Sequence, residues 1–234
     1  MRAADRGAVG AVRNISCGIV LAGGRGARMG AALPKALVEI DGVTLLDRAI
    51  ATLHECCDEV IVVAPAAVEL GSIDARRVFD GAAKEGPLAG LVAGLEACDG
   101  ETAAILGVDF PLVRAALLRD LAAGLAAEPA CEAVVTRPGG IAQPLVSAMR
   151  VRATATLRAA FDEGVRSMHG GIERLNVCWL DDEWLAQRAG GAGALLNVNT
   201  PEDLAAARLL LAQRAPAQSP RSQPPPASRR EAIA

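Results

Sequence analysis

Short apolar runs alternate along this chain with longer segments whose apolar residues recur at helical spacing. The runs predicted to be strands cover residues 17–21, 60–64, 77–79, 103–108, 133–136, 145–148 and 177–180. The predicted helices cover residues 45–57, 88–98, 114–127, 152–163 and 201–213. Strands that are apolar throughout are typical of a mainly parallel sheet with helices on both faces, so the expected fold is α/β with three layers, α/β/α. In such sheets ligands bind beyond the carboxyl ends of the strands, here after Leu21, Val63 and Val108.

The two ends of the chain differ in composition from the body between them. Of the 234 residues, 52% are apolar, enough for a sizeable core, and we expect a single domain over residues 15–214. Residues 1–14 are expected to be a flexible extension, and residues 215–234, rich in proline, serine, glutamine and arginine, a disordered tail. No uninterrupted apolar run reaches the roughly 18 residues of a membrane span, and residues 1–14 lack a secretory signal's apolar segment, so we expect a cytoplasmic protein.

Charge and aromatic content exclude several classes of function. Residues 213–234 carry a net charge of +3 within a chain of net charge −3, so the remainder sums to −6, which argues against a nucleic-acid-binding surface on the body. Three phenylalanines, two tryptophans and no tyrosine are too few for a platform that stacks single-stranded nucleic acid. The six cysteines form no C-x-x-C pair, so we expect small buried thiols in a reducing cytosol rather than a zinc site.

A glycine-rich segment follows the first predicted strand and reads LAGGRGARMGAALPK over residues 21–35. Its four glycines within eight residues let the backbone approach a ligand and turn N–H groups toward a phosphate, and Arg25, Arg28 and Lys35 add positive charge. A P-loop is excluded because the chain contains no Gly-Lys pair. The dinucleotide fingerprint is excluded because Met29 stands where it needs glycine. The segment therefore predicts a phosphate site of another kind.

Asp109 stands directly after the predicted strand 103–108, at the same edge of the expected sheet. Magnesium prefers one or two carboxylates together with phosphate oxygens and water, and Asp109 is well placed to supply one. The alternative is that Asp109 caps a helix that begins near Leu112. The first interpretation predicts that Asp109 and Lys35 face one shared site.

The pattern L-A-G-G-x-G-x-R-M-G followed by Pro-Lys closely resembles the signature of the nucleotidyltransferase superfamily. That superfamily includes sugar-phosphate guanylyltransferases, methylerythritol-phosphate cytidylyltransferases and molybdenum cofactor guanylyltransferases. The resemblance implies a Rossmann-like nucleotidyltransferase fold with a mainly parallel mixed sheet. It also implies that the start of the segment contacts the nucleobase and ribose, and that the following loop wraps the triphosphate. The nucleotide-binding residues implied in this way are Leu21, Ala22, Gly23, Gly24, Gly26, Lys35, Asp80, Gly86, Pro87, Leu88 and Asp109.

The stretch G-P-L-A-G-L that starts at Gly86 is similar to a second signature of the same superfamily. Gly86 and Pro87 open a predicted helix, and the positive end of a helix suits a phosphate or a base. Asp80, six residues earlier, matches the acidic residue that family members use with the nucleotide.

The string N-V-N-T-P-E-D-L near the C-terminus resembles molybdenum cofactor guanylyltransferases. Thr200 and Asp203 predict a capping-box start for the helix 201–213, which leaves the two amides of the string unexplained. By resemblance, the acceptor-binding residues are Gln143, Arg166, Asn197 and Asn199.

These features predict a magnesium-dependent nucleotidyltransferase with Lys35, Arg25 and Asp109 as catalytic residues and Asp109 as the metal ligand. By resemblance, the reaction is transfer of GMP from GTP to the phosphate of molybdopterin, with release of pyrophosphate. The Pro-Lys pair at residues 34–35 is instead similar to sugar or isoprenoid enzymes. It leaves open a CTP- or GTP-dependent transferase acting on molybdopterin, an isoprenoid precursor or a sugar phosphate.

A non-catalytic module that binds a nucleotide or the molybdenum cofactor is the alternative from another class. The expected partners are GTP or another NTP and a phosphorylated small-molecule acceptor, with neither nucleic acid nor membrane. Contacts with a molybdoenzyme or a chaperone stay open.

Overall fold

The computed structural model describes residues 15–23, 34–79, 86–188 and 191–214. The predicted extension over residues 1–14 and the predicted tail over residues 215–234 lie outside the described residues. Among the helices in the described ranges, none has the length and apolar character needed to cross a membrane.

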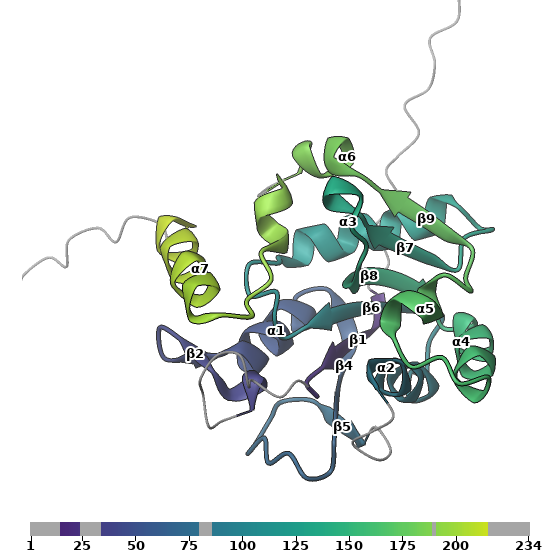
Figure 1. The fold of residues 1–234 in the computed structure, drawn as a ribbon, viewed down its shortest axis with the longest axis horizontal. Coiled ribbons are helices and arrows are strands. Elements are labelled where there is room, and N and C mark those ends of the chain that lie inside the picture. Colours follow the sequence, from purple (N-terminus) through teal and green to yellow (C-terminus); the bar gives the residue numbers. More distant parts are fainter. Residues whose placement is uncertain (1–14, 24–33, 80–85, 189–190, 215–234) are drawn as a thin grey trace, which may run out of the picture.

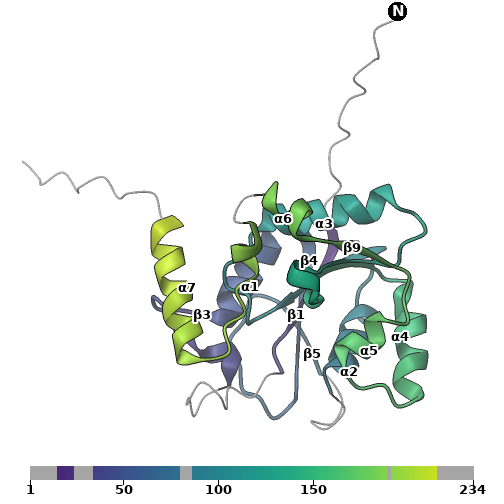
Figure 2. The same ribbon diagram turned by 45° about the horizontal axis from the view of Figure 1, so that its top comes forward.

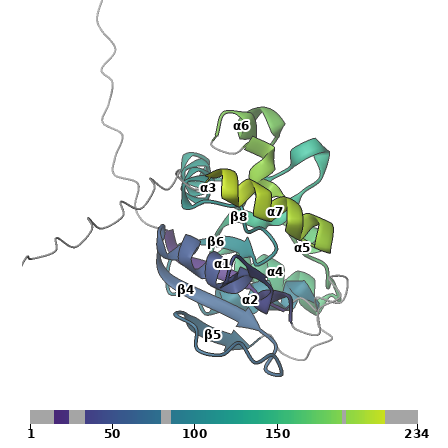
Figure 3. The ribbon, with the colours of Figure 1, turned by 90° about the vertical axis from the view of Figure 1, so that its left-hand side faces the viewer.

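Seven strands of the described residues form one central sheet (Figure 1). Their bounds are β1 Ile15–Leu21, β4 Cys57–Ala64, β5 Arg76–Phe79, β6 Thr102–Gly107, β7 Ala133–Thr136, β8 Gln143–Arg150 and β9 Val177–Leu180. The order across the sheet is β5-β4-β1-β6-β8-β7-β9, and Figure 3 shows the β5 edge beyond β4. The strands β5, β4, β1 and β6 are parallel, whereas β8 is antiparallel to both β6 and β7. The predicted sheet, mainly parallel but mixed, is thereby confirmed.

Helices cover both faces of this sheet, giving three layers (Figures 1 and 2). On one face α1 and α3 pack against Ala104 and Leu106 of β6, and on the other α2, α4 and α5 pack against Ala103 and Ile105. This alternation follows from the two-residue repeat of a strand, which sends successive side chains to opposite faces. The bounds are α1 Leu45–His54, α2 Pro87–Glu96, α3 Ala115–Ala127, α4 Ala153–Asp162, α5 Met168–Ile172, α6 Asp182–Ala186 and α7 Pro201–Arg214.

Two segments depart from the expectations. The helix predicted over residues 45–57 ends at His54, because Cys57 already belongs to β4. A small hairpin of β2 (Glu39–Ile40) and β3 (Val43–Thr44), not predicted, turns at Asp41 and Gly42, whose φ angles are 52° and 76°. The helix α7 lies beside this hairpin (Figure 2), and Arg208 donates to the Glu39 carbonyl at 3.3 Å.

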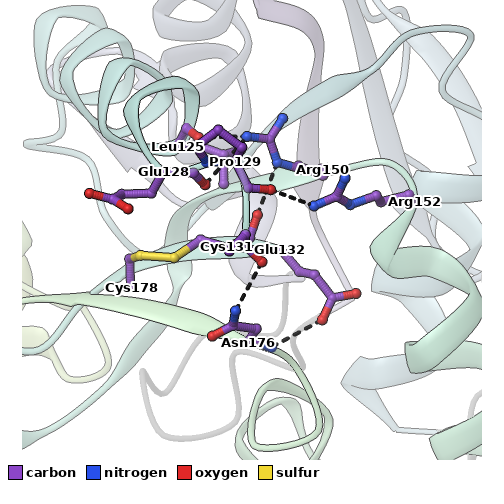
Figure 4. Close-up of a disulfide and its surroundings, with 10 residues drawn as sticks. Leu125, Glu128, Pro129, Cys131, Glu132, Arg150, Arg152, Asn176 and Cys178 are labelled. Carbon is purple, nitrogen blue, oxygen red and sulfur yellow. Dashed lines mark hydrogen bonds between the residues drawn. A yellow bond between two sulfur atoms is a disulfide. The ribbon is translucent and has the colours of Figure 1, made fainter.

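The cysteines correct one expectation. Cys131 and Cys178 form a disulfide that ties the start of β7 to β9 (Figure 4), so the prediction that all six cysteines are free thiols is wrong. Spacing gave no sign of this bond, because the partners are 47 residues apart in sequence and meet only when the two strands pair. The other four, Cys17, Cys56, Cys57 and Cys98, are free and buried as predicted.

Candidate active site

The carboxyl ends of β1 and β6 lie side by side in the centre of the sheet. Leu21 pairs with Gly107 in the parallel register, and the Ala22 N–H donates to the carbonyl of Val63 at the end of β4 at 2.9 Å. Asp109 follows the end of β6, with only Val108 between them. This is the edge at which parallel α/β sheets bind their ligands.

Lys35 opens the short 3-10 helix η2 (Lys35–Leu37) and is a buried lysine, with only 11% of its side chain exposed. Its Nζ lies 3.4 Å from Oδ2 of Asp109 and donates to Oδ1 of Asn199 at 2.7 Å. A buried ammonium group is costly unless it has such partners. The fold therefore brings together Lys35, Asp109 and Asn199, which are far apart in sequence.

The carboxylate of Asp109 folds back over the end of its own strand. A Cβ atom added to Gly107 would lie 2.3 Å from Oδ1 of Asp109, so only glycine leaves room for this arrangement. The Asp109 side chain is 15% exposed, so it and Lys35 are both largely buried. The alternative role, capping a helix that begins near Leu112, is wrong because α3 begins at Ala115 and its N-cap residue is Arg114.

Asn197 and Asn199 complete a chain of polar contacts with Lys35. The Asn199 Nδ2 donates to Oδ1 of Asn197 at 2.7 Å, while its Oδ1 accepts from Lys35. Between the two amides, the Val198 N–H donates to the backbone carbonyl of Asp109 at 2.8 Å. The predicted acceptor-side amides are therefore held at the same place as the predicted catalytic pair.

Asp203 fixes the backbone of this amide segment from the first turn of α7. Its Oδ2 accepts from the N–H groups of Asn199 and Thr200, each at 2.9 Å, and its own N–H donates to Oγ1 of Thr200 at 3.1 Å. The Asn199 bond, then the Thr200 bonds and the charge of Lys35, lower the pKa of Asp203, while burial opposes them. The predicted capping box is confirmed, but its third partner, Asn199, was not predicted.

The start of α2 forms a separate contact with the segment around Arg166. Gly86 has a φ of 80°, and a Cβ there would stand 2.7 Å from the Arg166 carbonyl, which also accepts from the Leu88 N–H at 3.2 Å. Pro87 is the first residue of the helix, and the Leu88 side chain is fully buried in the core. The Arg166 guanidinium lies over the Phe161 ring at 4.1 Å and donates to the Phe161 carbonyl at 2.6 Å. These contacts place Arg166 beside α2, within a different cluster from Lys35.

Gln143 opens β8 and pairs with Thr136 of β7. Because β8 runs antiparallel to β6, the start of β8 lies at the same edge as Asp109, and Leu145 lies against Gly107. Of the other predicted residues, Leu21 and Ala22 end β1 and Gly23 follows them, exposed. Four predicted site residues lie outside the described residues: Gly24, Arg25, Gly26 and Asp80.

Comparison with known proteins identifies relatives of this fold and site. A family model described as a MobA-like NTP transferase domain matches residues 18–175. A Chloroflexus aggregans protein named "Probable molybdenum cofactor guanylyltransferase" is 34% identical over 197 residues, covering 82% of this chain and 93% of that protein. The 2-C-methyl-D-erythritol 4-phosphate cytidylyltransferase of Deinococcus radiodurans is 32% identical over 207 residues, covering 82% and 88% respectively.

A solved structure shows the same architecture. Molybdopterin-guanine dinucleotide biosynthesis protein A from Archaeoglobus fulgidus has a TM-score of 0.72 at 25% identity, covering 84% of this chain and 99% of that one. These findings confirm the predicted family, fold and enzyme class, and they favour catalysis over a non-catalytic binding module. The chain belongs to the MobA-like NTP transferase family, and it is a nucleotidyltransferase.

Proposed function

We propose that this enzyme transfers GMP from GTP to the phosphate of molybdopterin, depends on magnesium and releases pyrophosphate. The observation that carries the proposal is the meeting of Lys35 and Asp109, 3.4 Å apart at the carboxyl edge of β1 and β6. The molybdenum cofactor guanylyltransferase named above as a relative supports the choice of acceptor and base.

The reaction needs no strong general base in this proposal. A phosphate acceptor is already anionic at neutral pH, so its oxygen attacks the α-phosphorus while the bond to pyrophosphate breaks. The difficulty is the repulsion between two anions and the charge that builds on the leaving pyrophosphate. Positioning and electrostatic stabilisation therefore supply most of the rate.

Lys35 meets this need because it is held before substrate arrives. Its ammonium group has its position fixed by Asp109 and Asn199 and is largely shielded from water. A charge held in a low-dielectric site stabilises developing negative charge without first having to reorganise. We assign Lys35 to the phosphate oxygens, together with Arg25 and the amides of the loop that includes Gly24 and Gly26.

Asp109 would supply one carboxylate ligand to a magnesium ion, and one is enough for this metal. Within the described part of the chain, no three His, Cys, Asp or Glu side chains gather into a metal-binding group. Magnesium tolerates this, since it is held by one or two carboxylates with phosphate oxygens and waters as its other ligands. When bound, the ion would neutralise charge on the phosphates. Lys35 lies 3.4 Å from Oδ2 of the same carboxylate, so the ion and the ammonium group would share it.

We assign the remaining predicted residues in two groups. The nucleotide group is Leu21, Ala22 and Gly23 at the end of β1, Gly86, Pro87 and Leu88 at the start of α2, and Asp80, which lies outside the described residues. The acceptor group is Gln143, Asn197 and Asn199, together with Arg166, which lies apart from them beside α2.

A cytidylyl transfer is the second candidate, because the Deinococcus radiodurans relative is a cytidylyltransferase at nearly the same identity. Pyrophosphate release, measured with each of the four NTPs and magnesium, decides between them. Molybdopterin and 2-C-methyl-D-erythritol 4-phosphate serve as acceptors. We expect the fastest release with GTP and molybdopterin. Fastest release with CTP would overturn the choice of base, and no release with any pair would overturn the proposal.

A further inference from the structure

Asp203 is hydrogen-bonded to Asn199, which in turn accepts a hydrogen bond from Lys35. Its Oδ2 accepts from the Asn199 and Thr200 N–H groups at 2.9 Å each. No contact between Asp203 and Lys35 is needed for the two to be linked, because Asn199 contacts both. The Asn199 backbone is bound to Asp203, and its side-chain oxygen accepts from Lys35 Nζ at 2.7 Å.

The direction of the Asn199 amide is determined by its two side-chain partners. Its oxygen faces the Lys35 ammonium, and its Nδ2 donates to Asn197 at 2.7 Å. An amide whose two ends are both engaged has one orientation that satisfies them. If the backbone of Asn199 moves, the oxygen moves with it, and Lys35 loses the shorter of its two contacts.

The rest of α7 packs against the core along one side of the helix. Ala207 is its buried side chain in the described structure, and Leu204 and Leu211 are half-buried. Leu209, by contrast, is 66% exposed. The hydrogen bonds of Asp203, unlike this apolar packing, are made directly to the backbone of the amide segment.

We infer that Asp203 is a positioning residue for the transfer reaction: it holds the Asn199 backbone so that the Asn199 amide fixes Lys35 at the reaction site. Its effect on turnover rests on the proposed function, whereas its effect on Lys35 does not. A role as helix cap alone predicts a different result, because cap loss destabilises α7 without changing the surroundings of Lys35.

The chain offers a direct probe, since Lys35 and Lys84 are its only lysines. Protein labelled with 13C at lysine Cε gives two lysine signals, and Lys84→Arg assigns the one from Lys35. We compare Asp203→Ala with Asn199→Ala and Asp203→Glu. Glutamate at this position is the usual capping-box residue, keeps the carboxylate and reaches the N–H of the N-cap residue, here Thr200. The matched control is Asp181→Ala, because Asp181 caps α6 by accepting from the Trp184 N–H at 3.1 Å.

We expect Asp203→Ala to shift the Lys35 signal in the direction seen for Asn199→Ala. Asp203→Glu is expected to restore the signal, and Asp181→Ala to leave it unchanged. A Lys35 signal that stays at the wild-type position in folded Asp203→Ala would overturn the inference. An equal shift in Asp181→Ala would also overturn it, because the effect would then be general to loss of a helix cap.

Kinetics give the second readout. We expect Asp203→Ala to lower kcat roughly tenfold, the scale of a lost supporting hydrogen bond, with KM for the nucleotide little changed. The double variant Asp203→Ala/Asn199→Ala should be no slower than Asn199→Ala alone, because both act through the same amide. Additive losses would contradict this route. If the wild type releases no pyrophosphate, the proposed function fails, and the lysine signals still decide the positioning role.

Discussion

Polar side chains bond to different partners at the two ends of the central sheet. At the carboxyl end of β6, Lys35, Asp109 and Asn199 bond to one another through their side chains. At the opposite end, Arg150 donates to the carbonyls of Cys131 and Leu125 at 2.9 Å and 2.7 Å (Figure 4). Most side-chain hydrogen bonds in proteins are of this second kind and secure loops. The contrast indicates that the first end is organised for a ligand and the second for stability.

The largest expected effect is at the carboxyl end of β6, the ligand end of the sheet. Lys35→Ala and Asp109→Ala should each lower kcat roughly 100- to 1000-fold, the cost of removing one preorganised charge, with the fold retained. Steady-state pyrophosphate release and circular dichroism measure the two properties. Arg152→Ala is the control, because Arg152 donates to the Pro129 carbonyl at the stability end. Near-wild-type turnover in both site variants would contradict a catalytic role for Lys35 and Asp109.

The next prediction concerns the disulfide between Cys131 and Cys178, at the opposite end of the sheet, the stability end. It closes a loop of 47 residues, so Cys131→Ser should destabilise the oxidised protein by about 4 kcal/mol, mainly because the unfolded chain gains conformational freedom. Urea unfolding with and without reductant measures this, and reductant should bring the wild type to the stability of the variant. The kcat of folded protein should not change. Equal unfolding midpoints in all four samples would contradict the structural role.

Gly107 is the last residue of β6 and lies under Asp109 at the carboxyl end of the strand. The Cβ of Gly107→Ala would stand 2.3 Å from Oδ1 of Asp109 and 3.1 Å from Cβ of Leu145. We expect turnover to fall about 100-fold, as for a catalytic group displaced by about 1 Å. Gly124→Ala in α3 is the control, because its added Cβ meets only Val134 at 3.8 Å. Unchanged turnover in Gly107→Ala would show that Asp109 does not need its observed position.

The smallest expected effect is on the stability of the protein at low pH. Hydrogen bonds from the Asn199 and Thr200 N–H groups lower the folded-state pKa of Asp203. Asp203 therefore stabilises the fold above the pKa of the unfolded carboxyl, and this contribution is lost as the pH falls through the folded-state pKa. In urea unfolding, the stability difference between wild type and Asp203→Ala should stay level from about pH 7 to about pH 5 and then shrink as the pH falls through the folded-state pKa. A constant difference would contradict the hydrogen-bonded carboxylate.

Much of the fold followed from local patterns. The continuous apolar runs of β1, β4 and β6 predicted the parallel centre, and turn chemistry fixed the start of α7 at Thr200 and Pro201. The β2–β3 hairpin was missed although Asp41-Gly42 is a strong turn signal, because two-residue strands carry no alternation to detect.

The site was predictable in part, for a physical reason. Glycine and charge patterns selected Lys35 and Asp109 as the residue types that phosphate chemistry needs. The contact between Lys35 and Asn199 joins residues 164 apart in sequence, and no local pattern contains it. The same holds for the link from Asp203 through Asn199 to Lys35, which exists only because the segment before α7 lies against the start of η2 and the end of β6.

The most direct test of the central claim is a crystal structure of this enzyme with magnesium and a non-hydrolysable GTP analogue. The account predicts phosphate oxygens within hydrogen-bonding distance of Lys35 Nζ and the metal on the carboxylate of Asp109. A triphosphate bound elsewhere, with Lys35 and Asp109 still contacting only each other and Asn199, would contradict it.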